Sequence, residues 1–184
     1  MNPMKGLHSM IFLKKLLFTL ACVSLLDSHM VFASDAADPW EAQIREADAT
    51  FWLVAFNQCD EKRMHDVVTD DMEFYHDQIG IVRGKSNFVK LTLENVCTIP
   101  NLKLRREAIP GTVTIEPLRD LRNGNKVYGA VVSGEHQFYS SEKGAPEVLG
   151  SKARFTHVML RDGLVWRLAR AISYSHKSAA ADKK

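Results

Sequence analysis

Several features are scarce or missing in this sequence of 184 residues, and each absence narrows its possible functions. The most apolar stretch, residues 16–26, is well short of the roughly 20 residues that an ordinary membrane-spanning helix needs. Neither charge is in clear excess, since the net charge is only +2. Basic residues are scattered among acidic ones, apart from Lys183 and Lys184 at the end, so we expect neither nucleic acid nor an anionic membrane surface as a partner.

The motifs of several common catalytic sites are also missing. Beyond residue 33 there is no H-x-x-x-H or H-E-x-x-H spacing, so metal ligands would have to come from separate strands. Gly80 and Gly84 are too isolated to form a phosphate-binding loop, and no serine occupies a recognisable nucleophile elbow. We therefore predict no bound metal, no other cofactor and no nucleophilic catalysis.

The first 33 residues have the pattern of a secretory signal peptide. Three lysines, the last of them Lys15, precede the apolar stretch, and Val31-Phe32-Ala33 offers a small-residue cleavage site. Cleavage after Ala33 would leave one domain, residues 34–184, with an ordered core at about 39–176 and no membrane span. Of the 24 basic and 22 acidic residues, three lysines and one aspartate lie in 1–33, so the predicted mature chain has 21 of each. We expect a periplasmic or secreted protein.

Cysteine is scarce, with three residues in the chain. Cys22 lies within the predicted signal peptide, where a lipoprotein processed at Cys22 is the less favoured alternative. Cys59 and Cys97 remain, and two cysteines in an oxidising compartment indicate a single disulfide. Such a bridge would stabilise the fold by roughly 3 to 4 kcal/mol in the chain-entropy model. The alternative is two separately buried thiols.

Hydrophobic periodicity predicts helices first and extended strands afterwards. In the first helix Ile44, Phe51 and Ala55 recur at helical spacing, while Arg45 and Asp48 are assigned to the solvent side. Turn signals separate the later extended runs, and short connections join the last three into an antiparallel meander. The predicted helices cover 39–58, 60–68 and 84–97; the predicted strands cover 72–76, 79–82, 102–109, 112–118, 126–139, 148–160 and 164–174. This order predicts an α+β fold in which the three helices pack in a strongly curved antiparallel sheet that leaves a cavity at its open end.

Several segments together resemble one known superfamily. They are Glu73-Phe74-Tyr75-His76-Asp77 with the following Gly80 and Gly84, Ala153-Arg154-Phe155-Thr156-His157, Trp166-Arg167-Leu168-Ala169-Arg170, and Ser173-Tyr174-Ser175-His176. With the helix and strand order, they make residues 40–176 similar to the nuclear transport factor 2-like superfamily, in its exported SnoaL-like branch (domain of unknown function 4440). The resemblance implies a cone-shaped α+β barrel with a pocket, often as a homodimer. Its enzymes include ketosteroid isomerase, scytalone dehydratase, limonene epoxide hydrolase and polyketide cyclases. None of their catalytic sets can be placed on this sequence residue by residue, so the resemblance implies no particular reaction.

Histidines and carboxylates are the candidates for chemistry. His76 with Asp77 is the first acid-base candidate and His157 the second, with Tyr174 as a hydrogen-bond donor to a ligand carbonyl. Adjacent strand residues point to opposite faces, so His76 and Asp77 cannot both face a pocket unless a bulge re-aims one of them. The alternative is a packing role for the histidines, which we favour for His76, His136 and His176. Tyr174 could equally be a core tyrosine with a satisfied hydroxyl. The predicted ligand-lining residues are Trp52, Phe56, Phe74, Glu135, Arg154, Phe155, Arg170 and His176.

Strand parity in the last extended run places Trp166, Leu168 and Ile172 on one face, together with Arg170, Tyr174 and His176. This face is mostly apolar, so it is expected to meet the helices and to bring Arg170 and Tyr174 to the pocket or its rim.

Three functions remain open at this stage. The first is an exported protein that binds a small apolar or mixed-polarity molecule. The second is a cofactor-free isomerase, dehydratase or hydrolase with a His/Asp acid-base pair. The third is an interaction module that dimerises through the outer face of its sheet.

Overall fold

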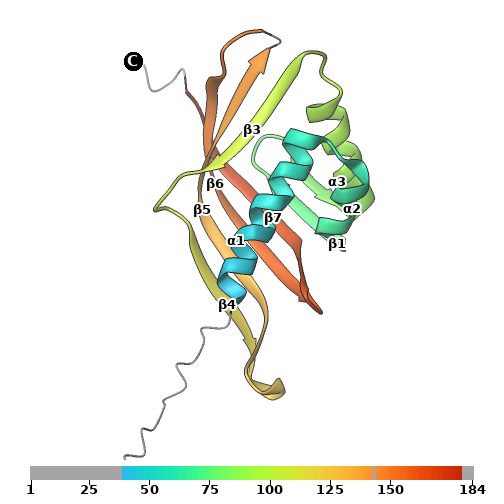
Figure 1. Ribbon diagram of the computed structural model, residues 1–184, viewed down its shortest axis with the longest axis vertical. Coiled ribbons are helices and arrows are strands. Elements are labelled where there is room, and N and C mark those ends of the chain that lie inside the picture. The colour runs from blue at the N-terminus through green and yellow to red at the C-terminus, as the bar shows by residue number, and fades with distance from the viewer. Residues whose placement is uncertain (1–38, 143, 180–184) are drawn as a thin grey trace, which may run out of the picture. The chain divides into compact units, whose positions relative to one another are not determined.

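The computed structural model describes residues 39–142 and 144–179 (Figure 1). The predicted signal peptide and its cleavage site lie outside these residues. Among the residues described, no helix is long and apolar enough to cross a membrane.

The helices lie where the periodicity predicts them. Helix α1 (Trp40–Trp52) continues directly into the π-helical segment η1 (Leu53–Gln58), and α3 (Lys85–Thr92) continues in the same way into η2 (Leu93–Cys97). Between them lies α2 (Glu61–Val67). Its N-terminus is capped by Asp60, whose Oδ1 accepts a hydrogen bond from the backbone N–H of Arg63 at 3.0 Å. The two π-helical segments are wider than α-helical turns, a feature that is frequent at functional sites.

Within the described residues, seven strands form one sheet in the order β2-β1-β7-β6-β5-β3, with β4 also paired to β5. The long strands β5, β6 and β7 form the predicted antiparallel meander, whereas β1 pairs with β7 in parallel. The strands are β1 (Val68–His76), β2 (Gly80–Arg83), β3 (Leu102–Ala108), β4 (Thr114–Asp120), β5 (Lys126–Glu142), β6 (Val148–Asp162) and β7 (Val165–Ser178), with a short 3-10 turn η3 (Leu121–Asn123) between β4 and β5. The sheet is curved and does not close, which confirms the predicted α+β class.

The core lies between α1 and the concave face of the sheet. Helix α1 crosses in front of β6 and β7, while α2 and α3 lie beside β1 (Figure 1). Ile44 and Phe51 of α1 and Phe155 and Met159 of β6 are all buried. Their burial supplies the main stabilisation, because each large apolar side chain removed from water contributes about 1.5 to 3 kcal/mol.

A β-bulge changes the inward face of β7 and overturns the parity prediction. Trp166 and Leu168 are buried as expected, but the pairing with β6 then shifts register, and the buried residues become Ala169, Ala171 and Ser173. Ile172 is 40% exposed, so its predicted contact with the helices is wrong. The prediction failed because an extra residue in one strand reverses every side chain beyond it.

Near the end of β7 the backbone changes direction again. Ser175 has a φ of 59°, which is uncommon for a residue other than glycine. The pairing with β6 shifts a second time there, between Lys152 and Arg154. As a result His176 comes to the same side of the strand as Ser173, and their side chains are within 3.3 Å of each other.

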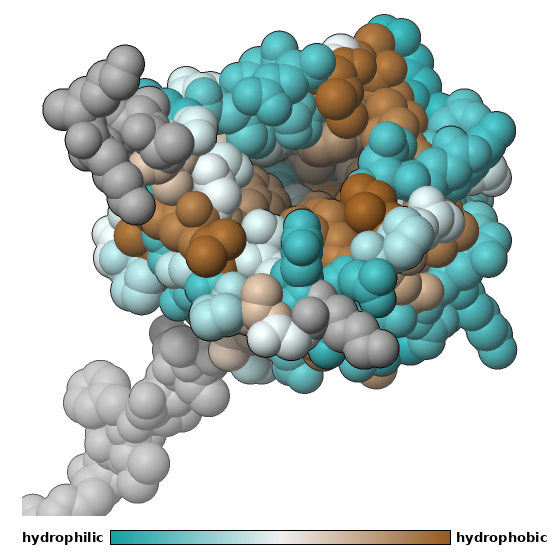
Figure 2. Space-filling model, turned by 90° about the horizontal axis from the view of Figure 1, so that it is seen from above, coloured by the Kyte–Doolittle hydropathy of each residue, from teal (hydrophilic) through white to brown (hydrophobic). Residues whose placement is uncertain are grey.

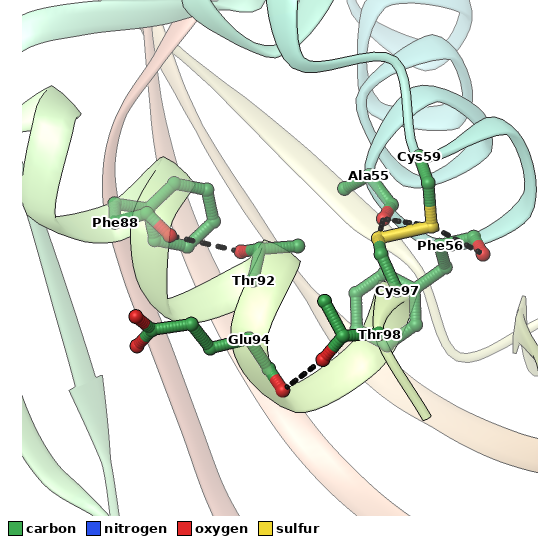
Figure 3. Close-up of a disulfide and its surroundings, with 8 residues drawn as sticks. All are labelled: Ala55, Phe56, Cys59, Phe88, Thr92, Glu94, Cys97 and Thr98. Carbon is green, nitrogen blue, oxygen red and sulfur yellow. Dashed lines mark hydrogen bonds between the residues drawn. A yellow bond between two sulfur atoms is a disulfide. The ribbon is translucent and has the colours of Figure 1, made fainter. Parts of the chain in front are cut away.

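The predicted disulfide is confirmed (Figure 3). Cys59 and Cys97 are bonded with their Cα atoms 5.7 Å apart, and the bond joins the ends of η1 and η2. The carbonyl oxygen of Ala55 lies 3.7 Å from the sulfur of Cys97. Close by, the hydroxyl of Thr98 donates to the carbonyl of Glu94 at 2.8 Å, which satisfies one carbonyl at the end of this helical segment.

Candidate functional site

A hollow of about 390 Å³ lies between the helices and the sheet. Its walls come from α1, η1, α3, η2 and the strands, and most of them are aromatic or aliphatic side chains. The hydrophobic walls and more hydrophilic rim of a hollow are visible in Figure 2. The aromatic part of the wall consists of Phe51, Trp52, Phe56, Phe74, Phe88 and Phe138, and the polar groups include His76, Ser173 and His176.

A second hollow of about 380 Å³ shares Trp52 with the first. Asp48 and Arg106 supply polar groups to its wall, and Val132 and Ile115 supply apolar ones. The indole of Trp52 therefore contributes to the walls of both hollows.

Asp48 is the centre of a buried ionic cluster. Its Oδ1 accepts a hydrogen bond from His157 Nδ1 at 2.8 Å, and its Oδ2 accepts one from the Arg106 guanidinium at 3.0 Å. The guanidinium carbon of Arg106 also lies 4.7 Å from the centre of the Trp52 ring and 4.6 Å from that of Phe155. Helix α1, strand β3 and strand β6 thus each contribute one charged or titratable group to a site from which water is largely excluded.

The placement of Asp48 corrects the expectation that it faces solvent. The residue is only 9% exposed, because it lies four positions after Ile44 and three before Phe51, on the buried stripe of α1. Helical spacing alone could have identified this position.

The charge of Asp48 is set by its partners. Burial alone would raise the pKa of Asp48, but the hydrogen bond from His157 and the electrostatic effects of His157 and Arg106 outweigh it and lower the pKa to about 2. Burial lowers the pKa of Arg106, and Asp48 opposes that shift. Asp48 is therefore ionised at neutral pH.

His136 extends the cluster across the sheet. The Nε of Arg106 donates to His136 Nδ1 at 3.2 Å, and His136 is fully buried. Burial, followed by the charge of Arg106, lowers the pKa of His136 to about 2. The ring is consequently neutral at pH 7, and because Nδ1 accepts, its proton is on Nε2, which lies 3.4 Å from Ser173 Oγ.

The row continues from Ser173 to the protein surface. Ser173 Oγ lies 3.3 Å from His176 Nε2, and His176 Nδ1 lies 2.5 Å from Asp77 Oδ1. The ring of His76 stacks on that of His176 with centroids 4.3 Å apart. Seven side chains are thereby linked in a row: Asp77, His176, Ser173, His136, Arg106, Asp48 and His157.

His76, Asp77 and His176 also place one potential ligand atom each within 4.8 Å of one another, so they could hold a metal ion. In the structure these atoms make hydrogen bonds: His76 Nδ1 accepts from the backbone N–H of Gln78 at 3.1 Å, and Asp77 accepts from His176. Burial, and then the charge of His176, lowers the pKa of His76, which favours a neutral ring at pH 7.

The predicted site residues fall into three groups. Trp52, Phe56, Phe74, His76 and His176 line the first hollow. His157 and Phe155 belong to the buried cluster around Asp48. Asp77 accepts a hydrogen bond from His176, whereas His76, its predicted partner, lies 3.6 Å away. The structure does not bring the remaining four to a hollow: Glu135 and Arg154 are exposed, Tyr174 lies beside the guanidinium of Arg154, and Arg170 pairs with Asp71 and Glu73.

Four members of the row were not among the predicted site residues: Asp48, Arg106, His136 and Ser173. His136 and His157 have a shared signal, since each is a polar residue at an inward position of an otherwise apolar strand. Ser173 has no such signal, because the bulges that aim it are not visible in the sequence.

The described part of the chain has the cone-shaped nuclear transport factor 2-like fold, with helices packed in a curved sheet around a ligand-sized hollow. No family model and no curated protein matches the sequence.

Several solved structures share this fold. Aln2 from a Streptomyces species matches with a TM-score of 0.62 and 9% identity over 79% of this chain and 95% of its own. The hexachlorocyclohexane dehydrochlorinase LinA-type3 from Novosphingobium barchaimii matches with a TM-score of 0.58 and 15% identity over 77% and 90%. A protein from Catenulispora acidiphila in complex with S-DNPA matches with a TM-score of 0.57 and 12% identity over 73% and 92%. At such identities the likeness concerns the fold.

Proposed function

We propose that this chain is an exported protein that binds a small, largely apolar molecule carrying one polar group. The observation that carries the proposal is the first hollow, where an aromatic wall ends at a cluster of hydrogen-bonding side chains. Ligand sites typically combine mostly apolar lining with a few polar groups that fix orientation. A volume of about 390 Å³ suits a molecule of one or two rings or a short acyl chain.

The polar end of the hollow favours a ligand oxygen. His76 Nδ1 accepts a hydrogen bond from Gln78, so the neutral ring carries its proton on Nε2 and can donate to a carbonyl or hydroxyl oxygen. Other structures of this fold include a dehydrochlorinase and a complex with the small molecule S-DNPA, which supports a small organic ligand here.

Export is supported by the pattern of residues 1–33 and by the disulfide between Cys59 and Cys97. Disulfides persist in oxidising compartments and are rare in the cytosol, so the bond favours a periplasmic or secreted location. A homodimer, as the family resemblance implies, belongs to the same proposal, and light scattering of the purified mature chain tests it.

A second candidate function is cofactor-free acid-base catalysis. The observation that favours it is the pair formed by Asp48 and His157, because a carboxylate bonded to Nδ1 fixes the tautomer and leaves Nε2 as a possible base. In this version Asp48 takes the role that the sequence suggested for Asp77. Proton abstraction from a substrate by wild type, lost in His157→Gln, would support it.

Native mass spectrometry of protein purified from its own compartment tests the binding proposal. We expect a bound organic molecule in wild type, little in His76→Ala, and wild-type occupancy in the control His65→Ala, where the histidine lies on α2 outside the hollow. His76→Ala should change the free energy of unfolding by no more than about 1 kcal/mol. Equal occupancy in all three proteins would overturn the proposed role of His76, and ready unfolding of His76→Ala would indicate a packing role instead.

A further inference from the structure

Ser173, His176 and Asp77 form a row whose geometry is that of a catalytic triad. Ser173 Oγ lies 3.3 Å from His176 Nε2, and Asp77 Oδ1 lies 2.5 Å from His176 Nδ1. The other carboxylate oxygen of Asp77 accepts from the backbone N–H of His176 at 3.2 Å, which fixes the carboxylate against the ring. Such triads occur on unrelated folds and are recognised by geometry rather than by sequence order.

The neighbouring hydrogen bonds set the direction of the Ser173 hydroxyl proton. Arg106 donates to His136 Nδ1, so the proton of neutral His136 lies on Nε2 and points to Ser173 Oγ. The Ser173 oxygen accepts this bond, and its own proton is left for His176 Nε2. His176 in turn donates its Nδ1 proton to Asp77. Arg106 Nε, His136 Nε2 and His176 Nδ1 each have an acceptor in this row, and the serine proton is directed to the histidine that would remove it.

The backbone conformation of β7 also brings Ser173 and His176 together. Ser173 and His176 are three residues apart on a strand and would face opposite sides if the strand were regular. The positive φ of Ser175 brings the two side chains together. Conformations of this kind in residues other than glycine are costly and occur preferentially at functional sites.

Both reacting side chains line the first hollow, and so does His76. His76 stacks on His176 and has its Nδ1 engaged by Gln78, so it can present an N–H to an oxygen of a bound ligand. A donor of this type would stabilise the negative charge that develops on a carbonyl oxygen under attack.

We propose, against the sequence-based prediction of no nucleophilic catalysis, that Ser173 is a nucleophile and that the chain hydrolyses small carboxylic esters with a short apolar acyl group. Ser173 Oγ attacks the ester carbonyl carbon while its proton passes to His176 Nε2. The bond to the leaving alcohol then breaks, and the alcohol departs with that proton. Water next attacks the acyl-serine, gives a proton to His176, and releases the carboxylic acid as Ser173 recovers its proton. The sum is ester plus water giving acid plus alcohol.

The inference uses the hollow of the proposed function but goes beyond binding. The mature protein is treated with an alkyl fluorophosphonate, which phosphonylates activated serines, and the modified residue is identified by tandem mass spectrometry. Hydrolysis of p-nitrophenyl butyrate is followed in parallel. Binding is measured separately from quenching of tryptophan fluorescence by p-nitrophenyl butyl ether, which has the same size but cannot be hydrolysed.

We expect one phosphonyl group per chain on Ser173 and none on Ser173→Ala, with hydrolysis at least about 100-fold slower in the variant. The control Ser133→Ala removes a serine hydroxyl that bonds to Thr156 away from the hollow, and it should react like wild type. Asp77→Asn should lower kcat more than it changes KM, because Asp77 is a positioning residue that orients His176. If Asp77 had a merely structural role, the substitution would leave kcat per folded chain unchanged.

Binding of the ether by wild type without modification of Ser173 would overturn the inference and leave the proposed binding function standing. Modification of another residue, or equal hydrolysis by Ser173→Ala, would overturn it as well. A divalent cation that native mass spectrometry finds in wild type and not in Asp77→Asn would also overturn it, because Asp77 and His176 would then be metal ligands instead of members of a triad.

Discussion

Asp48→Asn tests the buried ionic cluster. The substitution keeps the shape of the side chain but removes the charge that faces Arg106, whose side chain is only 4% exposed. One guanidinium nitrogen of Arg106, Nη2, already has no hydrogen-bond partner among the described residues. Breaking a buried pair by removing one partner costs about 3 to 5 kcal/mol. Because an amide oxygen can still accept one of the two bonds, we expect a loss of about 3 kcal/mol at pH 7.

The pH dependence of the free energy of unfolding gives a second measure of the cluster's contribution. The pKa of Asp48 falls from 3.8 to about 2 on folding, which corresponds to about 2 kcal/mol of stabilisation. Since the folded-state pKa is the lower one, this stabilisation is complete above about pH 4 and is lost as the pH falls from about 4 to about 2. Wild type should therefore lose about 2 kcal/mol more than Asp48→Asn across this window.

Urea denaturation followed by tryptophan fluorescence measures both quantities, since Trp52 contacts Arg106 directly. The control is Glu41→Gln on the same helix, where the carboxylate forms an exposed pair with Arg45 and its removal should cost less than about 1 kcal/mol. If Asp48→Asn costs no more than this control at pH 7, or if both proteins lose stability equally between pH 4 and pH 2, the cluster does not stabilise the fold as argued.

Two further predictions concern the covalent and steric constraints. The mature chain should show no free thiol under denaturing conditions, and one or two titratable thiols would contradict the disulfide. Because the two cysteines are 38 residues apart, replacing both Cys59 and Cys97 by serine should lower the free energy of unfolding by about 4 kcal/mol. Gly129→Ala should destabilise by about 1 to 3 kcal/mol, because its Cβ would lie 2.9 Å from the backbone oxygen of Met159. The control Gly150→Ala, whose Cβ would make only an ordinary 3.6 Å contact, should stay within about 0.5 kcal/mol in the same denaturation assay, and equal losses would contradict the steric argument.

Local patterns predicted the elements of the fold well. The predicted helix at 84–97 corresponds to α3 with η2, and the predicted strand at 102–109 corresponds to β3. Periodicity and turn residues act over a few positions, so they are visible in one sequence. The parallel pairing of β1 with β7 was not predicted, because it joins segments about 100 residues apart and leaves no local pattern.

The candidate site was predicted less well for the same physical reason. Half of the aromatic wall (Trp52, Phe56 and Phe74) and the two histidines of the first hollow could be named from their residue types. The row through Ser173 depends on two irregularities of β7, and a shift of one residue exchanges the inner and outer faces of a strand. Asp48 differs from this case, since its position on the helical stripe was visible and its acidic character misled the interpretation.

The disulfide has a consequence for the size of molecule that the hollow accepts. Cys59 and Cys97 tie together two helical segments that both contribute to its wall, so those segments cannot spread apart to admit a bulkier guest. At this end of the hollow, the space for a ligand changes through side-chain rotation, for example of Phe56. In an oxidising compartment the disulfide therefore fixes the spacing of these two segments, whereas reduction of the bond would allow that spacing to vary.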